Sequence, residues 1–142
     1  MVVPTFVRQA LASKPITVYG DGSQRRCFCH VSDVVRALAD LMEREEAYGE
    51  LFNIGSDEEI SIRELAERVR HAAAAKSEIV FVPYGEAHEE GFEDMDRRVP
   101  DTSKLRTLIG WEPKLRLEET LSDVVEYERA KSAVDDELTS AA

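Results

Sequence analysis

Apolar residues recur at helical spacing in several stretches of the chain. The first contains Phe6, Val7 and Ala10, shortly after a proline in a position that a first helical turn tolerates. A later stretch opens on Ser61, with Glu64 three residues on, and this pair forms a capping box. The spacing predicts helices over residues 4–11, 32–42 and 61–75, a helix that begins at residues 101–107 and stops at Gly110, and a last helix from about residue 117 that includes residues 127–131.

The helix expected over residues 32–42 is predicted to begin at a cap on Ser32 or Asp33. We expect its apolar stripe to face the core. That stripe consists of Val34, Val35, Leu38, Leu41 and Met42.

Short runs rich in β-branched residues stand between the predicted helices. Residues 16–19 end at a Gly-Asp-Gly turn, and residues 79–82 end at a proline, so both indicate strands. Residues 26–31 and 50–55 lack a helical stripe and are also expected to be extended. Because helices and short strands alternate, the predicted fold class is α/β.

The composition excludes several classes of protein. Of 142 residues, 43% are hydrophobic and 33% are charged, which is typical of a folded domain. No apolar run approaches the roughly 18 residues that a membrane-spanning helix needs. The net charge of −11 repels a phosphate backbone and disfavours nucleic-acid binding. With two cysteines and no signal segment at its start, the chain is expected to be cytoplasmic and not bound to a membrane.

The segment from residue 15 to residue 33 carries the most chemistry. A strand, a Gly-Asp-Gly turn and then Gln24, Arg25 and Arg26 could form a pocket for a flat base beside a phosphate, because arginine presents a rigid fork to phosphate oxygens. On these residues alone, an ordinary turn followed by two solvated arginines is the simpler interpretation.

Four motifs, in order, resemble those of one family. Residues 15–33 resemble the C-terminal, substrate-binding part of the extended short-chain dehydrogenase/reductases, the NAD-dependent epimerases, dehydratases and decarboxylases of nucleotide sugars. Residues 3–11 are similar to the helix that leads to the family's nucleobase pocket, and residues 52–66 to its Asn-Ile-Gly turn and next helix. Residues 97–113 resemble its closing motif. The amino-acid sequence of residues 15–24 is most similar to that of UDP-glucose 4-epimerases and UDP-glucuronate decarboxylases.

The resemblance implies roles for particular residues. The backbone near Thr17 is expected to read the edge of the base, with the ring of Tyr19 beside it. Arg26 is similar to an arginine that grips the diphosphate, and Arg98 to a second clamp, although a slip of one residue onto Arg97 would exchange their roles. The implied ligand is a UDP-sugar or a related nucleotide sugar. The substrate-binding set implied by the resemblance is Val2, Phe6, Thr17, Tyr19, Arg26 and Arg98.

The family's cofactor machinery has no counterpart in this sequence. The family binds NAD at a glycine-rich turn that opens a helix, whereas the turn at residues 20–22 lacks the third glycine. Tyr127 and Lys131 have the spacing of the family's catalytic Tyr-X-X-X-Lys pair, but they follow the closing motif and are ordinary neighbours on a helix. We therefore expect neither a catalytic residue nor a cofactor site in this chain.

The resemblance also implies that Met1 matches an interior position, so that the N-terminal cofactor half is missing. We expect residues 1–131 to bind the nucleotide sugar without hydride transfer, and residues 132–142 to form a flexible tail. Apolar surface left without its partner is expected to favour self-association or pairing with a separate cofactor-binding half. The intact family epimerises, dehydrates or decarboxylates its substrate, and the residues present do not choose among these reactions.

Two alternatives stay open. A non-catalytic interaction or scaffold module would keep the fold without the ligand. A thiol enzyme built on Cys27 and Cys29 would need a thiol of depressed pKa, and packing thiols are the expected outcome. His30 is expected to be structural, and the acidic loop over residues 84–100 is expected to fold over the sugar.

Overall fold

The computed structural model describes residues 1–83 and 95–140, and in them helices surround short strands. This arrangement confirms the α/β class. The helical elements are α1 (Val2–Leu11), α2 (Val31–Met42), the 3-10 helix η1 (Glu45–Ala47), α3 (Ile62–Ala72), α5 (Ser103–Ile109) and α6 (Leu117–Ser140). Among the described residues, no helix is both long and apolar enough to cross a membrane.

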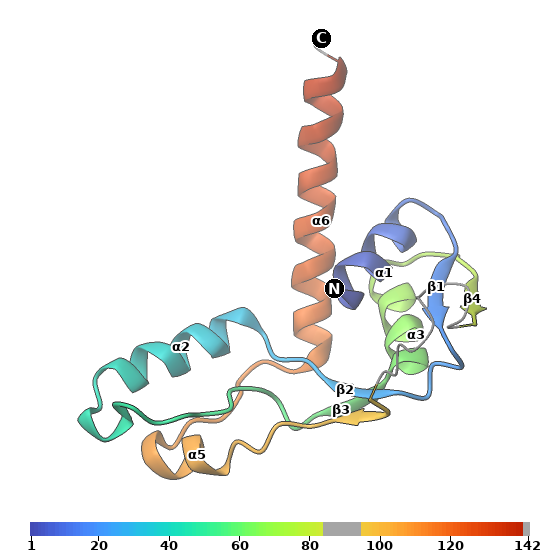
Figure 1. Ribbon diagram of the computed structural model, residues 1–142. Helices are drawn as coiled ribbons and strands as arrows, with labels where there is room; N and C mark the ends of the chain where they lie inside the picture. Colours follow the sequence, from blue (N-terminus) through green and yellow to red (C-terminus); the bar gives the residue numbers. More distant parts are fainter. Residues whose placement is uncertain (84–94, 141–142) are drawn as a thin grey trace.

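The described strands form two small sheets. In the first, β1 (Ile16–Tyr19) runs parallel to β4 (Ile79–Val82). In the second, β2 (Arg25–Cys27) lies between the antiparallel β3 (Glu59–Ser61) and the parallel β5 (Arg97–Arg98). Figure 1 shows β1 and β4 beside α1 and α3, whereas α2 and α5 lie together on the other side of α6.

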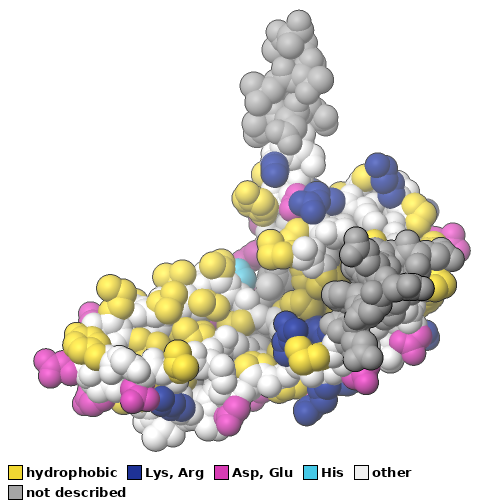
Figure 2. All heavy atoms as spheres, in the orientation of Figure 1, with side chains coloured by type: hydrophobic (Ala, Val, Ile, Leu, Met, Phe, Trp, Pro, Cys, Tyr) yellow, Lys and Arg dark blue, Asp and Glu magenta, His cyan; other side chains and the backbone are white. Residues whose placement is uncertain are grey.

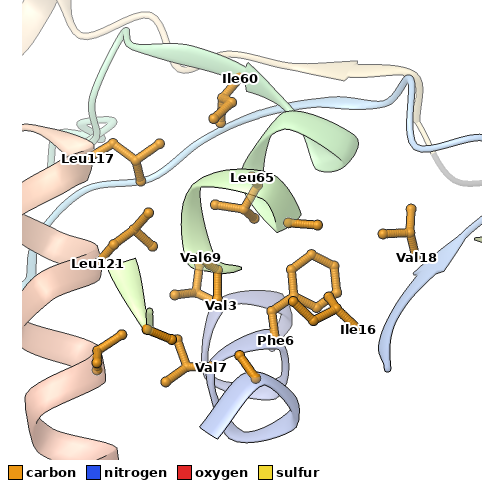
Figure 3. Packing of buried hydrophobic residues seen from close by; sticks show 14 residues of the cluster. Val3, Phe6, Val7, Ile16, Val18, Ile60, Leu65, Val69, Leu117 and Leu121 are labelled. Atoms are coloured by element: carbon orange, nitrogen blue, oxygen red, sulfur yellow. The ribbon is translucent and has the colours of Figure 1, made fainter. Parts of the chain in front are cut away.

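The larger core lies where α1, α3 and α6 pack beside β1. α1 buries Phe6 and Val7, and α3 buries Leu65 and Val69, as the helical spacing predicts. Figure 3 shows these side chains gathered with Ile16 of β1. Each of the five is at most 3% exposed, and burying such a side chain stabilises the fold by about 1.5–3 kcal/mol. The core therefore fixes α1 against β1.

A smaller core is centred on Trp111 and joins α2 to the segment before α6. The buried carboxylate of Asp33 accepts hydrogen bonds from the backbone N–H groups of Lys114 (2.9 Å) and Leu115 (3.0 Å). The Asp33 carbonyl oxygen accepts one from Trp111 Nε1 at 3.0 Å, and Arg36 Nη2 donates to the Asp33 carboxylate at 2.6 Å. Asp33 thus connects the two segments.

The cap predicted for α2 is wrong. The helix begins at Val31, and His30 Nδ1 accepts the hydrogen bond from the Ser32 N–H at 3.1 Å. His30 Nε2 lies 3.3 Å from Asp123 Oδ2 on α6. His30 is therefore structural, as expected, because both of its nitrogens hold α2 in place.

The inward orientation predicted for the α2 stripe is also wrong in large part. Val35, Leu38 and Met42 are 57%, 49% and 78% exposed, because the hydrogen bonds of Asp33 turn the opposite face of α2 toward Trp111. Figure 2 shows hydrophobic side chains gathered over α2. The chain thus exposes large apolar side chains along α2. We name the exposed large hydrophobic residues of α2 the outer stripe: Val31, Val35, Leu38 and Met42.

Several element boundaries differ from the expectation. Residues 50–55 form no strand, and the strand in this region is β3, which ends on the capping residue Ser61. Pairing of β2 ends at Cys27, so only the first part of residues 26–31 is a strand. α6 continues to Ser140, past residue 131 where the folded region was expected to end. Most of the acidic loop, residues 84–94, lies outside the described residues.

Candidate functional site

A cavity of about 490 Å³ opens between α1, β1, β2 and β5. Every residue that the sequence analysis expected to bind substrate lines it, although these residues come from four separate elements. The lining consists of Met1, Val2, Thr5, Phe6, Gln9, Thr17, Tyr19, Gln24, Arg26, Cys27, Phe28, Ile62 and Arg98.

Two adjacent pairs of arginines are divided between the faces of β2 and β5, because side chains alternate along a strand. Arg25 is opposite Arg97, and Arg26 is opposite Arg98. The Glu59 carboxylate binds the first pair, at 2.6 Å from Arg25 Nε and 3.0 Å from Arg97 Nη2. The second pair lines the cavity. The structure therefore places Arg98 in the cavity and Arg97 on the opposite face, bound to Glu59.

Glu59 holds the short strand β5 in place. Hydrogen bonds from Arg97 are the largest influence on the Glu59 carboxyl group, and with those from Arg25 they hold its pKa below the ordinary value against a smaller, opposing effect of burial. A backbone hydrogen bond of 2.7 Å from the Arg25 N–H to the Asp96 carbonyl oxygen adds to this attachment. Glu59 therefore helps to position Arg98.

Two cationic side chains line the cavity side of the β2–β5 pair. Arg26 and Arg98 are register partners on neighbouring strands, and both line the cavity. Arg26 Nη1 donates to the Arg25 carbonyl oxygen at 2.8 Å, which restrains the Arg26 side chain. Among the described residues, no acidic side chain forms an ion pair with Arg98.

One edge of β1 faces the cavity. The Ile16 and Gly20 N–H groups donate to β4, at 2.8 Å from the carbonyl oxygens of Glu78 and Val82. Because successive residues of a strand point their backbone groups to opposite sides, the N–H and C=O of Thr17 point away from β4. The Thr17 N–H donates to Gln9 Oε1 at 3.1 Å. The Thr17 carbonyl oxygen therefore lies on the edge beside Gln9 as a hydrogen-bond acceptor.

The walls of the cavity are apolar and aromatic. Phe6 is only 3% exposed and belongs to the core, so it forms the floor, whereas Tyr19 is 44% exposed. Val2 and Phe28 are half-buried and pack on the same core. A flat ring can therefore contact apolar surface while its edge faces β1.

Two glycines permit the close packing around the arginines. Gly22 has a φ of +73°, and a Cβ there would lie 2.9 Å from Val18 Cγ1. A Cβ on Gly55 would lie 2.8 Å from Pro100 Cγ. The Gly-Asp-Gly turn and the Asn-Ile-Gly turn therefore need glycine for steric reasons.

A second cavity of about 630 Å³ shares Arg26, Cys27 and Arg98 with the first. On its far side Asn53 Nδ2 donates to the Asp101 carbonyl oxygen at 3.1 Å, which ties the Asn-Ile-Gly turn to the closing motif. The arginine pair thus lies where two adjoining cavities meet.

Comparisons with known proteins show the family of the chain. A family model described as GDP-mannose 4,6 dehydratase matches residues 1–124. The chain belongs to this family of extended short-chain dehydrogenase/reductases. A UDP-N-acetyl-alpha-D-glucosaminuronate decarboxylase of Bacillus cytotoxicus is 39% identical over 128 residues, which are 90% of this chain and 40% of that protein. The chain thus spans about 40% of the length of this relative.

Solved structures of the family have the same fold. The UDP-glucose 4-epimerase of Thermotoga maritima, solved with UDP-glucose, matches 92% of this chain and 40% of its own, with a TM-score of 0.81 and 32% identity. The UDP-glucuronic acid 4-epimerase of Bacillus cereus, solved with UDP-glucuronic acid and NAD, matches 89% of this chain and 40% of its own, with a TM-score of 0.76 and 25% identity.

The cysteines do not form a reactive thiol pair. Burial raises the pKa of the Cys27 thiol, and the nearby Glu59 carboxylate raises it further. Burial likewise raises the pKa of the Cys29 thiol, and the Asp33 carboxylate raises it further. Since the thiolate is the reactive form, these shifts oppose nucleophilic chemistry, as expected of packing thiols. Tyr127, of the Tyr-X-X-X-Lys spacing, is 65% exposed on α6 and does not line the cavity.

Gln9 and Gln24 line the cavity, yet neither belongs to the substrate-binding set implied by the resemblance. Gln9 stands three residues after Phe6 on α1, so helical spacing places both on one face. That signal could have identified Gln9. Gln24 is 6% exposed, and its position beside β1 depends on the turn between β1 and β2.

Proposed function

We propose that residues 1–131 bind a nucleoside diphosphate sugar, with its base in the 490 Å³ cavity and its diphosphate between Arg26 and Arg98. The observation that carries this proposal is the pairing of Arg26 with Arg98 at the mouth of an aromatic cavity, while Glu59 binds the two neighbouring arginines. Residues 132–142 lie beyond this binding region.

Local charge supplies the affinity. The ligand's diphosphate carries about two negative charges, and the net charge of −11 opposes its approach. Each charge-assisted hydrogen bond from an arginine contributes roughly 1.5–3 kcal/mol, so the two guanidinium groups can overcome this opposition. Their placement on facing strands suits the two phosphate groups.

The β1 edge offers a hydrogen-bond acceptor to a base. The Thr17 carbonyl oxygen can accept the N3–H of uracil or the N4–H of cytosine, so it does not choose between these bases by itself. Guanine also carries a ring N–H at N1. Because the named relatives act on or bind UDP-sugars, we propose UDP-sugar as the ligand.

The Gly-Asp-Gly turn does not fit the pyrophosphate of NAD. The turn after β1 leads into strand β2, so no helix N-terminus follows it to receive a pyrophosphate. We propose that the sugar chemistry of the family requires a separate dinucleotide-binding half, and that the outer stripe of α2 packs on that half. The supporting observation is the row of exposed apolar side chains spaced along one face of α2.

An NMR amide-shift titration of the chain with UDP tests the binding proposal, with NAD as the control ligand. We expect shifts over residues 18–28 with UDP only. Arg26→Ala should weaken UDP binding about tenfold or more. Arg25→Ala is the matched control, because Arg25 binds Glu59 outside the cavity, and it should change UDP binding by no more than about threefold. Absence of shifts at millimolar UDP would refute the proposal.

An interaction module without ligand is the second candidate, and the outer stripe of α2 favours it. Such a module would bind its partner through this stripe and would not respond to UDP. The same titration therefore separates the two functions.

A further inference from the structure

The imidazole of His30 connects two helices at the start of α2. Its Nδ1 accepts the hydrogen bond from the Ser32 N–H at 3.1 Å and so caps α2, and its Nε2 lies 3.3 Å from Asp123 Oδ2 on α6. The His30 side chain is 13% exposed, so water reaches only a small part of the ring. The ring therefore links the helix that carries the outer stripe to α6.

The two contacts of the ring place opposite demands on its protonation. A neutral imidazole has one N–H and one acceptor nitrogen. Since Nδ1 accepts the Ser32 N–H, the single proton is on Nε2, beside Asp123. A second proton has only Nδ1 to bind to, and a protonated Nδ1 cannot accept a hydrogen bond. The cap of α2 therefore requires the neutral ring, whereas the Asp123 carboxylate favours the charged ring.

The other charges around His30 come from the two helices that it connects. The titratable and charged side chains within about one turn of its contacts are Asp33 and Arg36 on α2, and Glu119, Asp123, Glu126 and Tyr127 on α6. Arg36 Nη2 donates to the Asp33 carboxylate at 2.6 Å, and Glu119 Oε2 accepts the Arg116 N–H at 2.8 Å, so both of these carboxylates bind other groups. The N-terminal end of α2 carries a partial positive charge, which opposes a charged ring. Asp123 lies within ion-pair distance and has the opposite effect.

We propose that His30 is a pH-sensitive cap, which releases the first turn of α2 when Nδ1 takes up a proton and keeps its contact with Asp123. Histidine side chains as a class change charge between pH 5 and pH 8, so the device operates in this range. Val31, the first residue of the outer stripe, lies in the released turn. The apolar surface of α2 is thus held firmly by the neutral ring and loosely by the charged ring. The simpler interpretation is a ring that stays neutral over this range and has only a structural role.

NMR spectroscopy of the unmodified chain from pH 8 to pH 5 tests the proposal. The ¹⁵N shifts of the ring report the protonation of each nitrogen, and hydrogen exchange, corrected for its intrinsic pH dependence, reports the protection of the Ser32 amide. The exposed His71 on α3 serves as an internal reference for the ring shifts. We expect an unprotonated Nδ1 at pH 8 and a protonated one at pH 5. The protection of the Ser32 amide should fall about fivefold over the same range, from the loss of one N-cap bond.

Two variants separate the ring from other titrating groups. His30→Asn keeps a side-chain oxygen that caps a helix and does not titrate, so the protection of Ser32 should stay constant from pH 8 to pH 5. Asp123→Asn removes the carboxylate that favours the charged ring, so the fall in protection should move to lower pH.

Three results would overturn the proposal: an Nδ1 that is protonated at pH 8, a protection of Ser32 that does not follow the ring, or an equal fall in His30→Asn. The first two need no variant to fold. Because these measurements use no nucleotide, their outcome is independent of the proposed UDP-sugar binding.

Discussion

The division of the four arginines between two faces predicts unequal effects of Arg98 and Arg97 on the affinity for UDP. Arg98 lines the cavity, whereas Arg97 binds Glu59 and has a side chain that is 66% exposed. Replacing each with glutamine removes one positive charge in either case. The two variants therefore have the same net charge and differ only in the face of β5 that they change.

The magnitude follows from the bonds that each arginine makes. A charge-assisted bond from Arg98 to a phosphate oxygen contributes roughly 1.5–3 kcal/mol, so Arg98→Gln should raise the dissociation constant for UDP by roughly 10- to 150-fold. Arg97→Gln loses an exposed ion pair with Glu59 and should leave UDP affinity within about threefold, since exposed ion pairs contribute little.

Calorimetric titration with UDP measures both variants at fixed ionic strength, because phosphate contacts weaken as salt rises. Uridine serves as a second ligand that has the base and no diphosphate. Arg98→Gln should not change the affinity for uridine. A larger loss of UDP affinity in Arg97→Gln than in Arg98→Gln would refute the assignment of faces, and an equal loss for uridine would refute the role in phosphate binding.

Two further predictions concern stability and association. Asp33→Ala leaves the N–H groups of Lys114 and Leu115 without their buried acceptor and should lower the free energy of unfolding by about 2–4 kcal/mol in urea denaturation. Burial raises the pKa of Asp33, but hydrogen bonds led by that of Leu115 outweigh it and set the pKa below the ordinary value. The difference in free energy of unfolding between the unmodified chain and Asp33→Ala should therefore be largest at neutral pH and shrink as the pH falls below about 4. A difference that stays constant with pH would contradict this reasoning. Replacing Leu38 and Met42 together with serine should weaken self-association of the chain in sedimentation experiments, and an unchanged association constant would show that the outer stripe is not the contact.

The elements with local signals could be predicted from the sequence. The Ser61 N-cap forms as expected, with its Oγ accepting the Glu64 N–H at 3.1 Å, whereas the Glu64 carboxylate accepts a hydrogen bond from Arg68. Gly110 ends α5 in the left-handed region with a φ of +66°. These features depend on a few adjacent residues, and periodicity placed the helices for the same reason.

The errors concern elements whose environment is set by distant residues. β3 is three residues long and exists because it pairs with β2, more than thirty positions earlier. The inward face of α2 depends on the bonds of Asp33 to residues near 115, and no local pattern contains that information. An apolar stripe shows that a helix buries a face, but not whether the partner lies within the same chain.

One part of the candidate site could be predicted from local motifs, and another part depends on distant residues. The motifs identified six of the residues that line the cavity, but the placement of Arg97 and Arg98 on opposite faces became visible only with the position of Glu59, which carried no signal of its own. The Glu59 carboxylate binds one arginine from β2 and one from β5 and so adds a bond between the two strands. β5 is only two residues long, and its own backbone bonds are few. An acidic residue outside the cavity therefore helps to hold Arg98 within it.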